Sequence, residues 1–303
     1  MRIGIDLGGS KIEGSVLDGA NQVSAGPIRV ATPRNDYPAT LAAIVDVIAR
    51  LEHLLAPGDH PASIGIGMPG SIVPVTGRVQ NANSTWLNGR PLQADLEALL
   101  GRPVRLANDA NCFTLSEAID GAGVDADTVF GVILGTGCGG GLVVDGRLLN
   151  GPMGIAGEWG HNPLPRPTLE EFPGPMCWCG RRGCMETWVS GPALEADDAA
   201  QSGDTRTAFE IAAAAAIGDA AAADTLRRHT DRLGRGLAHV INLFDPDVVV
   251  LGGGLSNLDH LYRDLPDAIS PHLFADRPVV DIRRPVWGDS GGVRGAAWLW
   301  EMA

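Results

Sequence analysis

The strongest constraint on the fold is a glycine-rich segment that occurs twice. The first copy covers residues 2–19 and the second covers residues 131–146. One constant shift aligns the two copies without a gap. It matches Gly4, Leu7, Gly8, Gly14, Val16, Asp18 and Gly19 with Gly131, Leu134, Gly135, Gly141, Val143, Asp145 and Gly146.

Each copy has the pattern of a strand, a glycine turn and a returning strand. Glycines leave room for a ligand beside the backbone, and successive N–H groups of such a turn can bind phosphate oxygens. Ser10 and Lys11 are further donors. A glycine pair also occurs in ordinary hairpin turns, so one copy alone leaves both interpretations open. Two copies in register indicate a duplicated unit, and we predict two similar lobes that each present a phosphate-binding hairpin to a shared cleft.

The net charge excludes one class of partner. The 303 residues include 23 Lys and Arg against 36 Asp and Glu, a formal charge of −13. Such a chain lacks the basic surface of a nucleic-acid binder, and an anionic nucleotide would need local donors and a divalent metal. No secretory signal precedes Ile3, and no apolar run is long enough to span a bilayer. We therefore predict a cytoplasmic protein with no nucleic-acid or membrane partner.

The order of expected elements predicts an α/β fold. The first half reads as three strands, helix, strand, helix, strand and helix, and the second half repeats this order around a Gly/Pro-rich insertion. This alternation of strands and helices predicts mixed β-sheets with helices covering both faces. After the first hairpin, the expected ranges are 22–31, 38–55, 64–68, 92–100, 104–107 and 110–119. In the second half they are 129–144 (two strands), 147–149, 211–223, 226–244, 248–251, 258–273, 279–282 and 293–300.

Asn108 and Asp109 lie where an expected strand passes into a helix. Ligands of open α/β sheets gather at the carboxyl ends of strands. Asp109 at such an end can accept a proton from a substrate hydroxyl during phosphoryl transfer. The alternative is that Asn108 or Asp109 only caps the helix, which contributes about 1 kcal/mol. The two roles are compatible.

Three of the five cysteines, Cys177, Cys179 and Cys184, occur within eight residues. This spacing favours a tetrahedral zinc site in a reducing compartment over a disulfide framework. His161 is our choice for the fourth ligand. Four protein ligands leave no open position, so we predict a structural zinc ion that fixes the loop carrying Glu158, His161 and Glu186.

The strand expected at residues 248–251 passes into three glycines. Gly253 and Gly254 would allow a flat ligand such as adenosine to approach the backbone closely. A flexible turn is the alternative.

These motifs resemble the ROK family of sugar kinases over essentially the whole chain. The resemblance rests on the first hairpin, the Asn-Asp-Ala-Asn segment, Gly135-Thr136-Gly137, the Gly-Glu-Trp-Gly-His segment and the cysteine motif. The segments at residues 81–89 and 158–164 look like bacterial fructokinases of the mannofructokinase type, with N-acetylglucosamine kinases as near relatives. The family has the duplicated actin/hexokinase (ribonuclease H-like) fold, with two lobes around a central cleft.

The resemblance implies a role for each matched residue. Asp109 is the catalytic base, and Asp6 lies near magnesium. Residues implied to bind the sugar are Asn83, Asn108, Asp109, Glu158, His161 and Glu186. Residues implied to bind ATP are Asp6, Gly8, Gly9, Ser10, Lys11, Thr136, Gly137, Gly253 and Gly254. Zinc is implied on His161, Cys177, Cys179 and Cys184. Ser10 and Cys138 depart mildly from the family pattern.

We therefore predict a kinase that uses ATP, Mg²⁺ and a structural Zn²⁺ to phosphorylate the 6-hydroxyl of D-fructose. The alternative is an N-acetylglucosamine kinase or glucokinase of the same family. A sugar-responsive repressor would carry a DNA-binding motif before the first hairpin, and an actin-like filament has no reason for a zinc-braced loop. The expected lobes are 1–119, with the helix at about 292–303 packed on it, and 120–291, with the insertion at about 151–190. A homodimer is the family expectation.

Overall fold

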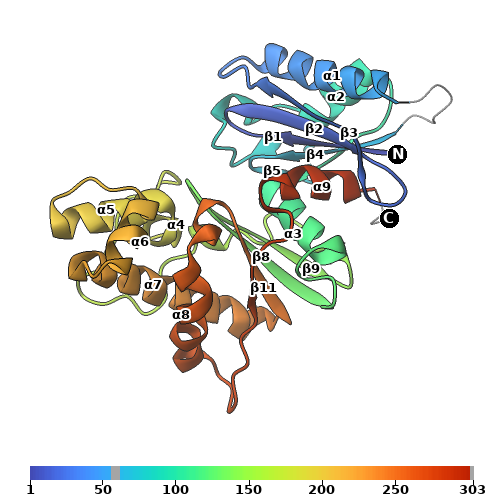
Figure 1. The fold of residues 1–303 in the computed structure, drawn as a ribbon. Coiled ribbons are helices and arrows are strands. Elements are labelled where there is room, and N and C mark those ends of the chain that lie inside the picture. The colour runs from blue at the N-terminus through green and yellow to red at the C-terminus, as the bar shows by residue number, and fades with distance from the viewer. Residues whose placement is uncertain (56–61, 301–303) are drawn as a thin grey trace. The chain divides into compact units, whose positions relative to one another are not determined.

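The computed structural model describes residues 1–55 and 62–300, which form two compact units (Figure 1). The first unit contains residues 1–124, 141–156 and the described residues from Trp287 onward; the second contains 125–140 and 157–286. Residues 141–156, predicted in the C-terminal lobe, fall in the first of these units, although residues 143–144 and 147–148 pair within the second sheet. The predicted lobe boundaries stay a prediction. Gly141 contacts the helix that follows Asn108, since a Cβ at Gly141 would lie 2.5 Å from Thr114 Oγ1.

The first unit is built on a mixed sheet with the strand order β3-β2-β1-β4-β7. β1 pairs antiparallel with β2 and parallel with β4, which pairs parallel with β7. The predicted order of elements is confirmed. Its members are β1 (Arg2–Leu7), β2 (Lys11–Leu17), β3 (Val23–Ala31), α1 (Tyr37–His53), β4 (Ser63–Met68), α2 (Leu92–Leu100), β7 (Arg105–Asn108) and α3 (Asp109–Asp120). A hairpin of β5 (Ser71–Ile72) and β6 (Val79–Gln80) after β4 was not predicted.

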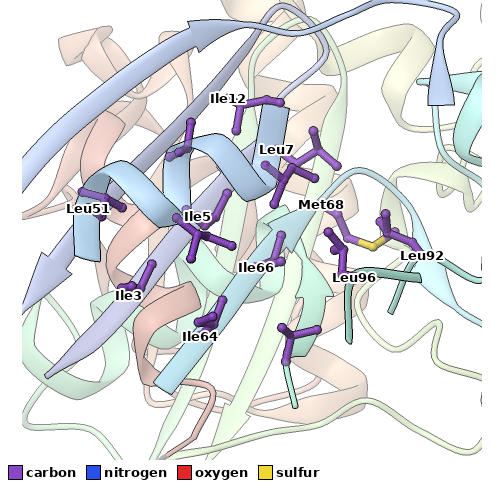
Figure 2. Packing of buried hydrophobic residues seen from close by; sticks show 14 of the residues in the cluster. Ile3, Ile5, Leu7, Ile12, Leu51, Ile64, Ile66, Met68, Leu92 and Leu96 are labelled. Carbon is purple, nitrogen blue, oxygen red and sulfur yellow. The ribbon is translucent and has the colours of Figure 1, made fainter. Parts of the chain in front are cut away.

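The core of this unit lies between the sheet and helices α1 and α2. Ile3 and Ile5 of β1 and Ile64 and Ile66 of β4 are fully buried, together with Leu51 of α1 (Figure 2). Each strand places alternate side chains on this face, so a single strand contributes two or three core residues. Burying one such side chain contributes roughly 1.5–3 kcal/mol.

Helix α9 (Gly291–Trp298) covers the opposite face of the sheet, as Figure 1 shows. Glycines allow this close approach. A Cβ at Gly4 would lie 1.9 Å from the carbonyl oxygen of Val293, and a Cβ at Gly295 would lie 1.6 Å from that of Cys112 in α3. The helix was expected to extend to residue 303, but residues 301–303 lie outside the described residues.

The second sheet has the strand order β10-β9-β8-β11-β12 and is also mixed. β8 and β11 pair in parallel, whereas β9 and β10 pair antiparallel. Helix α7 packs against α5, α6 and α8 within the second unit. The elements are β8 (Thr128–Leu134), β9 (Cys138–Val144), β10 (Arg147–Leu148), α4 (Glu186–Val189), α5 (Gly191–Ser202), α6 (Ala208–Ala216), α7 (Ala220–Phe244), β11 (Val248–Gly252), α8 (Asp259–Ile269) and β12 (Ile282–Arg283).

Two predicted elements of the second half were wrong in their bounds. The expected helix over 211–223 is interrupted, because Gly218 adopts a φ of +98° and Asp219 then caps α7 by accepting from the Ala222 N–H. The strand expected at 279–282 is reduced to β12, because Val279 is 90% exposed and pairing with β11 begins only at Asp281. Helices α4 and α5 were not predicted. In the described part of the chain, no helix combines the length and the apolarity that crossing a membrane needs.

Candidate active site and metal centre

The β1–β2 turn is held by its own backbone and by one side chain. The Gly8 N–H donates to the carbonyl oxygen of Lys11 at 2.9 Å, and the Thr32 hydroxyl donates to the carbonyl oxygen of Gly8 at 2.7 Å. Gly8 and Gly9 keep negative φ angles, so the turn does not require the left-handed region that glycine favours. What glycine provides at Gly8 is space, since a Cβ there would lie 3.0 Å from the carbonyl oxygen of Lys11.

Lys11 follows the exposed Gly9 and Ser10 of this turn, and its ammonium group is held by an acidic neighbour. Its Nζ lies 2.9 Å from Glu13 Oε2, and Arg29 Nε lies 2.8 Å from the same oxygen. Burial alone would raise the pKa of Glu13, but hydrogen bonds from Arg29 and Lys11 lower it overall. The Lys11 side chain is therefore anchored close to the turn that was predicted to bind phosphate.

Asp6, at the end of β1, is the most perturbed acid of the first unit's site. Burial, reinforced by the negative charge of Asp109, raises the pKa of Asp6 to about 7, although Lys11 acts in the opposite direction. The negative charges of two carboxylates repel each other, and a divalent cation relieves such repulsion with the oxygen ligands that Mg²⁺ prefers. The donor chemistry of Asp6 and Asp109 therefore fits the predicted magnesium.

Asn108 and Asp109 form the junction of β7 and α3. The Asn108 side chain is the N-cap: its Oδ1 accepts from the Ala110 N–H at 2.9 Å, and its Nδ2 donates to the carbonyl oxygen of Gly70 at 3.0 Å. Asp109 begins the helix with an exposed side chain whose Oδ1 accepts from the same N–H at 2.8 Å. The capping interpretation is confirmed for Asn108, and Asp109 lies at the carboxyl end of β7 as expected. The role of Asp109 in proton transfer stays a prediction.

Asn83 lies on an exposed loop of the first unit that Asn88 shapes. The Asn88 side chain accepts from the Ala82 N–H and donates to the Ala82 carbonyl oxygen, each at 2.9 Å. One amide thus holds the residue before Asn83 on both sides, which limits the freedom of the Asn83 backbone. A Cβ at Gly9 would lie 3.6 Å from Ser84 Oγ, so this loop and the β1–β2 turn are neighbours.

The β8–β9 turn of the second unit lies beside the glycines that follow β11. The Gly135 N–H donates to the carbonyl oxygen of Gly137 at 3.1 Å, and Thr136 between them is exposed. Gly253 has a φ of +74°, and a Cβ there would lie 2.5 Å from the carbonyl oxygen of Leu134, so only glycine fits. Gly254 is different, because a Cβ there would meet nothing within 4 Å. The structure therefore brings the predicted phosphate and adenosine segments of this unit together.

The four predicted zinc ligands form one cluster. The ligand atoms of His161, Cys177, Cys179 and Cys184 all lie within 4.8 Å of one another. Cys177 Sγ lies 3.6 Å from His161 Nδ1, and Cys179 Sγ lies 3.6 Å from Cys184 Sγ. Ligand atoms of a tetrahedral zinc ion with Zn–S near 2.3 Å and Zn–N near 2.0 Å lie roughly 3.5–3.8 Å apart. The cluster fits a structural zinc ion.

A tight turn and a short bridge build this cluster. The Gly180 N–H donates to the carbonyl oxygen of Cys177 at 3.0 Å, and Gly180 has a φ of +86°. Pro163 and Cys184 form an isolated antiparallel bridge, which aligns the His161 segment with the end of the cysteine loop. The loop thus closes on itself before α4 begins at Glu186.

Glu186 connects the cysteine loop to the β8–β9 turn. Its Oε2 accepts from the Cys138 N–H at 3.0 Å, and its Oε1 accepts from the Trp178 indole N–H at 2.7 Å. A Cβ at Gly137 would lie 2.6 Å from Glu186 Oε2, so glycine at this position makes room for the carboxylate. Glu186 was predicted as a site residue, but its hydrogen-bond partners were not. The position of Trp178 between two predicted zinc ligands could have indicated that its side chain belongs to the site.

Glu158 precedes the short helical turn at Trp159–His161 and is partly buried. Burial raises the pKa of Glu158; His161 opposes this shift and the charge of Glu186 adds to it. These three residues therefore influence one another electrostatically, as expected for groups that share one site.

The predicted site residues separate into two sets, one in each unit. The first unit holds Asp6, Gly8, Gly9, Ser10, Lys11, Asn83, Asn108 and Asp109. The second holds Thr136, Gly137, Glu158, His161, Cys177, Cys179, Cys184, Glu186, Gly253 and Gly254. Within each unit the members come from segments far apart in the sequence.

Comparisons of this chain with known proteins all point to the same protein family. The model of the ROK family matches residues 2–303. The N-acetyl-D-glucosamine kinase of Yersinia enterocolitica is 40% identical over 303 residues, which cover 99% of each protein.

Solved structures agree with this match. The ROK hexokinase from Thermus thermophilus superimposes with a TM-score of 0.84 and 33% identity, covering 98% of this chain and 96% of that one. A ROK family glucokinase from Streptomyces griseus, solved with glucose and AMPPNP, gives a TM-score of 0.78 and 30% identity over 98% of both chains. These matches confirm the predicted actin/hexokinase-like α/β fold.

Proposed function

The chain belongs to the ROK family and is a sugar kinase that uses ATP, and we propose that its acceptor is N-acetyl-D-glucosamine. The observation that carries the proposal is the 40% identity to an N-acetyl-D-glucosamine kinase over nearly the full length of both proteins. D-fructose was the predicted acceptor because of two short segments, residues 81–89 and 158–164. Identity over the whole chain is the broader support, and it favours the acetamido sugar.

Asp109 is the proposed general base. A sugar hydroxyl is a weak nucleophile, and a carboxylate that accepts its proton as the bond to phosphorus forms contributes typically 10²–10⁴-fold to the rate. The exposed position of Asp109 at the end of β7 supports this role, and its bond to the Ala110 N–H orients the carboxylate. The primary 6-hydroxyl of the sugar is the proposed nucleophile.

The nucleotide is proposed to bind the two glycine hairpins and the glycines after β11. The turn N–H groups, Ser10, Lys11 and Thr136 would donate to phosphate oxygens, and the open side of Gly254 leaves room for the adenosine. Magnesium, held near Asp6, would neutralise charge on the phosphates. Asn83, Asn108, Glu158, His161 and Glu186 are the proposed partners of the sugar hydroxyls.

A coupled assay of ADP release tests the acceptor directly. Purified protein is supplied with Mg²⁺, ATP and, in separate reactions, N-acetylglucosamine, glucose, mannose or fructose. We expect the highest kcat/KM for N-acetylglucosamine, by at least tenfold over fructose. A higher kcat/KM for fructose would refute the proposed acceptor and restore the original prediction, and a higher kcat/KM for glucose would favour the glucokinase alternative.

A further inference from the structure

Trp178 occupies an unusual position for a large aromatic side chain. It lies between the zinc-site residues Cys177 and Cys179, and 58% of its surface is exposed. An exposed aromatic residue adds little to a hydrophobic core, so core packing does not account for it. The turn closed by Gly180 fixes its backbone.

The Trp178 side chain contacts two residues of the proposed sugar site. Its indole N–H donates to Glu186 Oε1 at 2.7 Å, a short bond to a charged acceptor. Its ring meets the His161 ring edge-on, with centroids 5.0 Å apart and an interplanar angle of 84°. Hydrogen bonds to a charged group are roughly twice as strong as those between neutral groups.

The Glu186 carboxylate is thereby held at both oxygens. The Cys138 N–H binds Oε2 and the Trp178 indole binds Oε1, which uses two of the roughly four lone-pair sites of a carboxylate. The remaining sites can accept from sugar hydroxyls. A glutamate side chain that is fixed before binding loses less conformational entropy when the sugar arrives.

From these contacts we propose that Trp178 is a positioning residue of the acceptor site, which orients Glu186 for the sugar. The inference rests on the proposed role of Glu186 in binding the acceptor. Zinc would act on the sugar site through this contact, because the metal fixes the turn, the turn fixes the indole and the indole fixes the carboxylate. The Cys177 sulfur, 3.9 Å from Glu186 Oε1, lies beside the same contact.

Trp178→Phe tests the proposal, because it keeps an aromatic side chain at this position and removes the N–H donor to Glu186. We expect the KM for the acceptor to rise about tenfold, with kcat and the KM for ATP changed less than twofold, since the lost contact supports binding in ground and transition states alike. Zinc content and melting temperature should match the wild type. Met176→Leu is the matched control, as an exposed apolar residue of the same loop, and should leave all these values unchanged.

A double variant distinguishes positioning from a general effect on the loop. If Trp178 acts through Glu186, then adding Trp178→Phe to Glu186→Ala, which leaves no acceptor for the indole N–H, should change kcat/KM by less than twofold. Independent, multiplicative losses would overturn the proposal, as would an unchanged acceptor KM in Trp178→Phe or an equal rise in the KM for ATP.

The same variants keep the two hypotheses separate. Should the wild-type enzyme prefer another hexose over N-acetylglucosamine, the proposed acceptor fails, and the series repeated on the preferred hexose still decides the role of Trp178.

Discussion

The two glycine hairpins share a backbone plan but differ in the source of the carboxylate beside them. In the first copy the acid belongs to the repeat itself, because Asp6 ends β1. In the second copy the aligned position is Ile133, and the carboxylate comes from Glu186, which follows the cysteine loop. The two hairpins therefore share a turn, but the acidic residue beside it comes from a different part of the chain in each unit.

The two acids also have opposite electrostatic surroundings. Burial, and to a lesser degree the negative charge of Asp109, raise the pKa of Asp6 to about 7. Glu186 instead accepts hydrogen bonds from two N–H donors, the Cys138 amide and the Trp178 indole. One carboxylate thus has another acid as its neighbour, whereas the other has hydrogen-bond donors.

The largest expected effect is on turnover, and it distinguishes the proposed base Asp109 from the proposed sugar-binding residue Glu186. Asp109→Asn should lower kcat by roughly 10²–10⁴ with little change in the acceptor KM, because the amide cannot accept the hydroxyl proton. Glu186→Gln should act mainly on the acceptor KM. Steady-state kinetics of both variants, with circular dichroism to verify folding, make the measurement. Near-normal turnover of Asp109→Asn would remove that residue from the role of base.

The second prediction concerns the cost of ionising Asp6. Its pKa is about 7 in the folded protein and near 3.8 when unperturbed, so the folded state binds the proton more tightly. Ionising Asp6 in the folded state therefore lowers the free energy of unfolding. This loss is absent below about pH 4, grows as the pH rises to about 7 and is constant above that pH. At about 1.4 kcal/mol per pKa unit, Asp6→Asn should stabilise the metal-free protein by roughly 2–4 kcal/mol at pH 8 and hardly at pH 4.

Urea unfolding in magnesium-free buffer at the two pH values measures this difference. A gain for Asp6→Asn that is equal at pH 4 and pH 8 would contradict the electrostatic explanation.

The smallest expected effect concerns the second hairpin alone. Gly137→Ala would place a Cβ 2.6 Å from Glu186 Oε2, so the carboxylate must move, whereas a Cβ at Gly135 meets nothing closer than 4.0 Å. We expect Gly137→Ala to raise the acceptor KM about tenfold, which corresponds to about 1.4 kcal/mol. Gly135→Ala should leave the acceptor KM nearly unchanged. Equal acceptor KM values for the two variants would refute the proposed steric link.

Local sequence signals predicted much of the fold. The apolar spacing predicted α1, and the buried apolar run predicted β11, each to within a few residues. Asn108 caps α3, as expected for an asparagine directly before a helix. Where long-range packing decides, these signals failed. Val279 has the apolar character of a strand residue but stays exposed, because on this side of the sheet β11 pairs with Ile282 and Arg283 instead.

The site shows the same division. The cysteine spacing predicted a metal cluster, since ligands close in sequence on a tight turn are close in space. The partners of Glu186 were not predictable, because Cys138 and Trp178 lie 48 and 8 residues away and only the folded loop brings them to one carboxylate.

By itself the sequence determined that this chain contains a duplicated hairpin, alternating strands and helices, and the cysteine loop. Each of these features depends on the spacing of residues within a short segment. Only the tertiary structure decided which carboxylate is destabilised by burial and a nearby like charge, and which accepts hydrogen bonds from N–H donors. Such environments depend on distances between residues that the chain places far apart, and burial strengthens their effect.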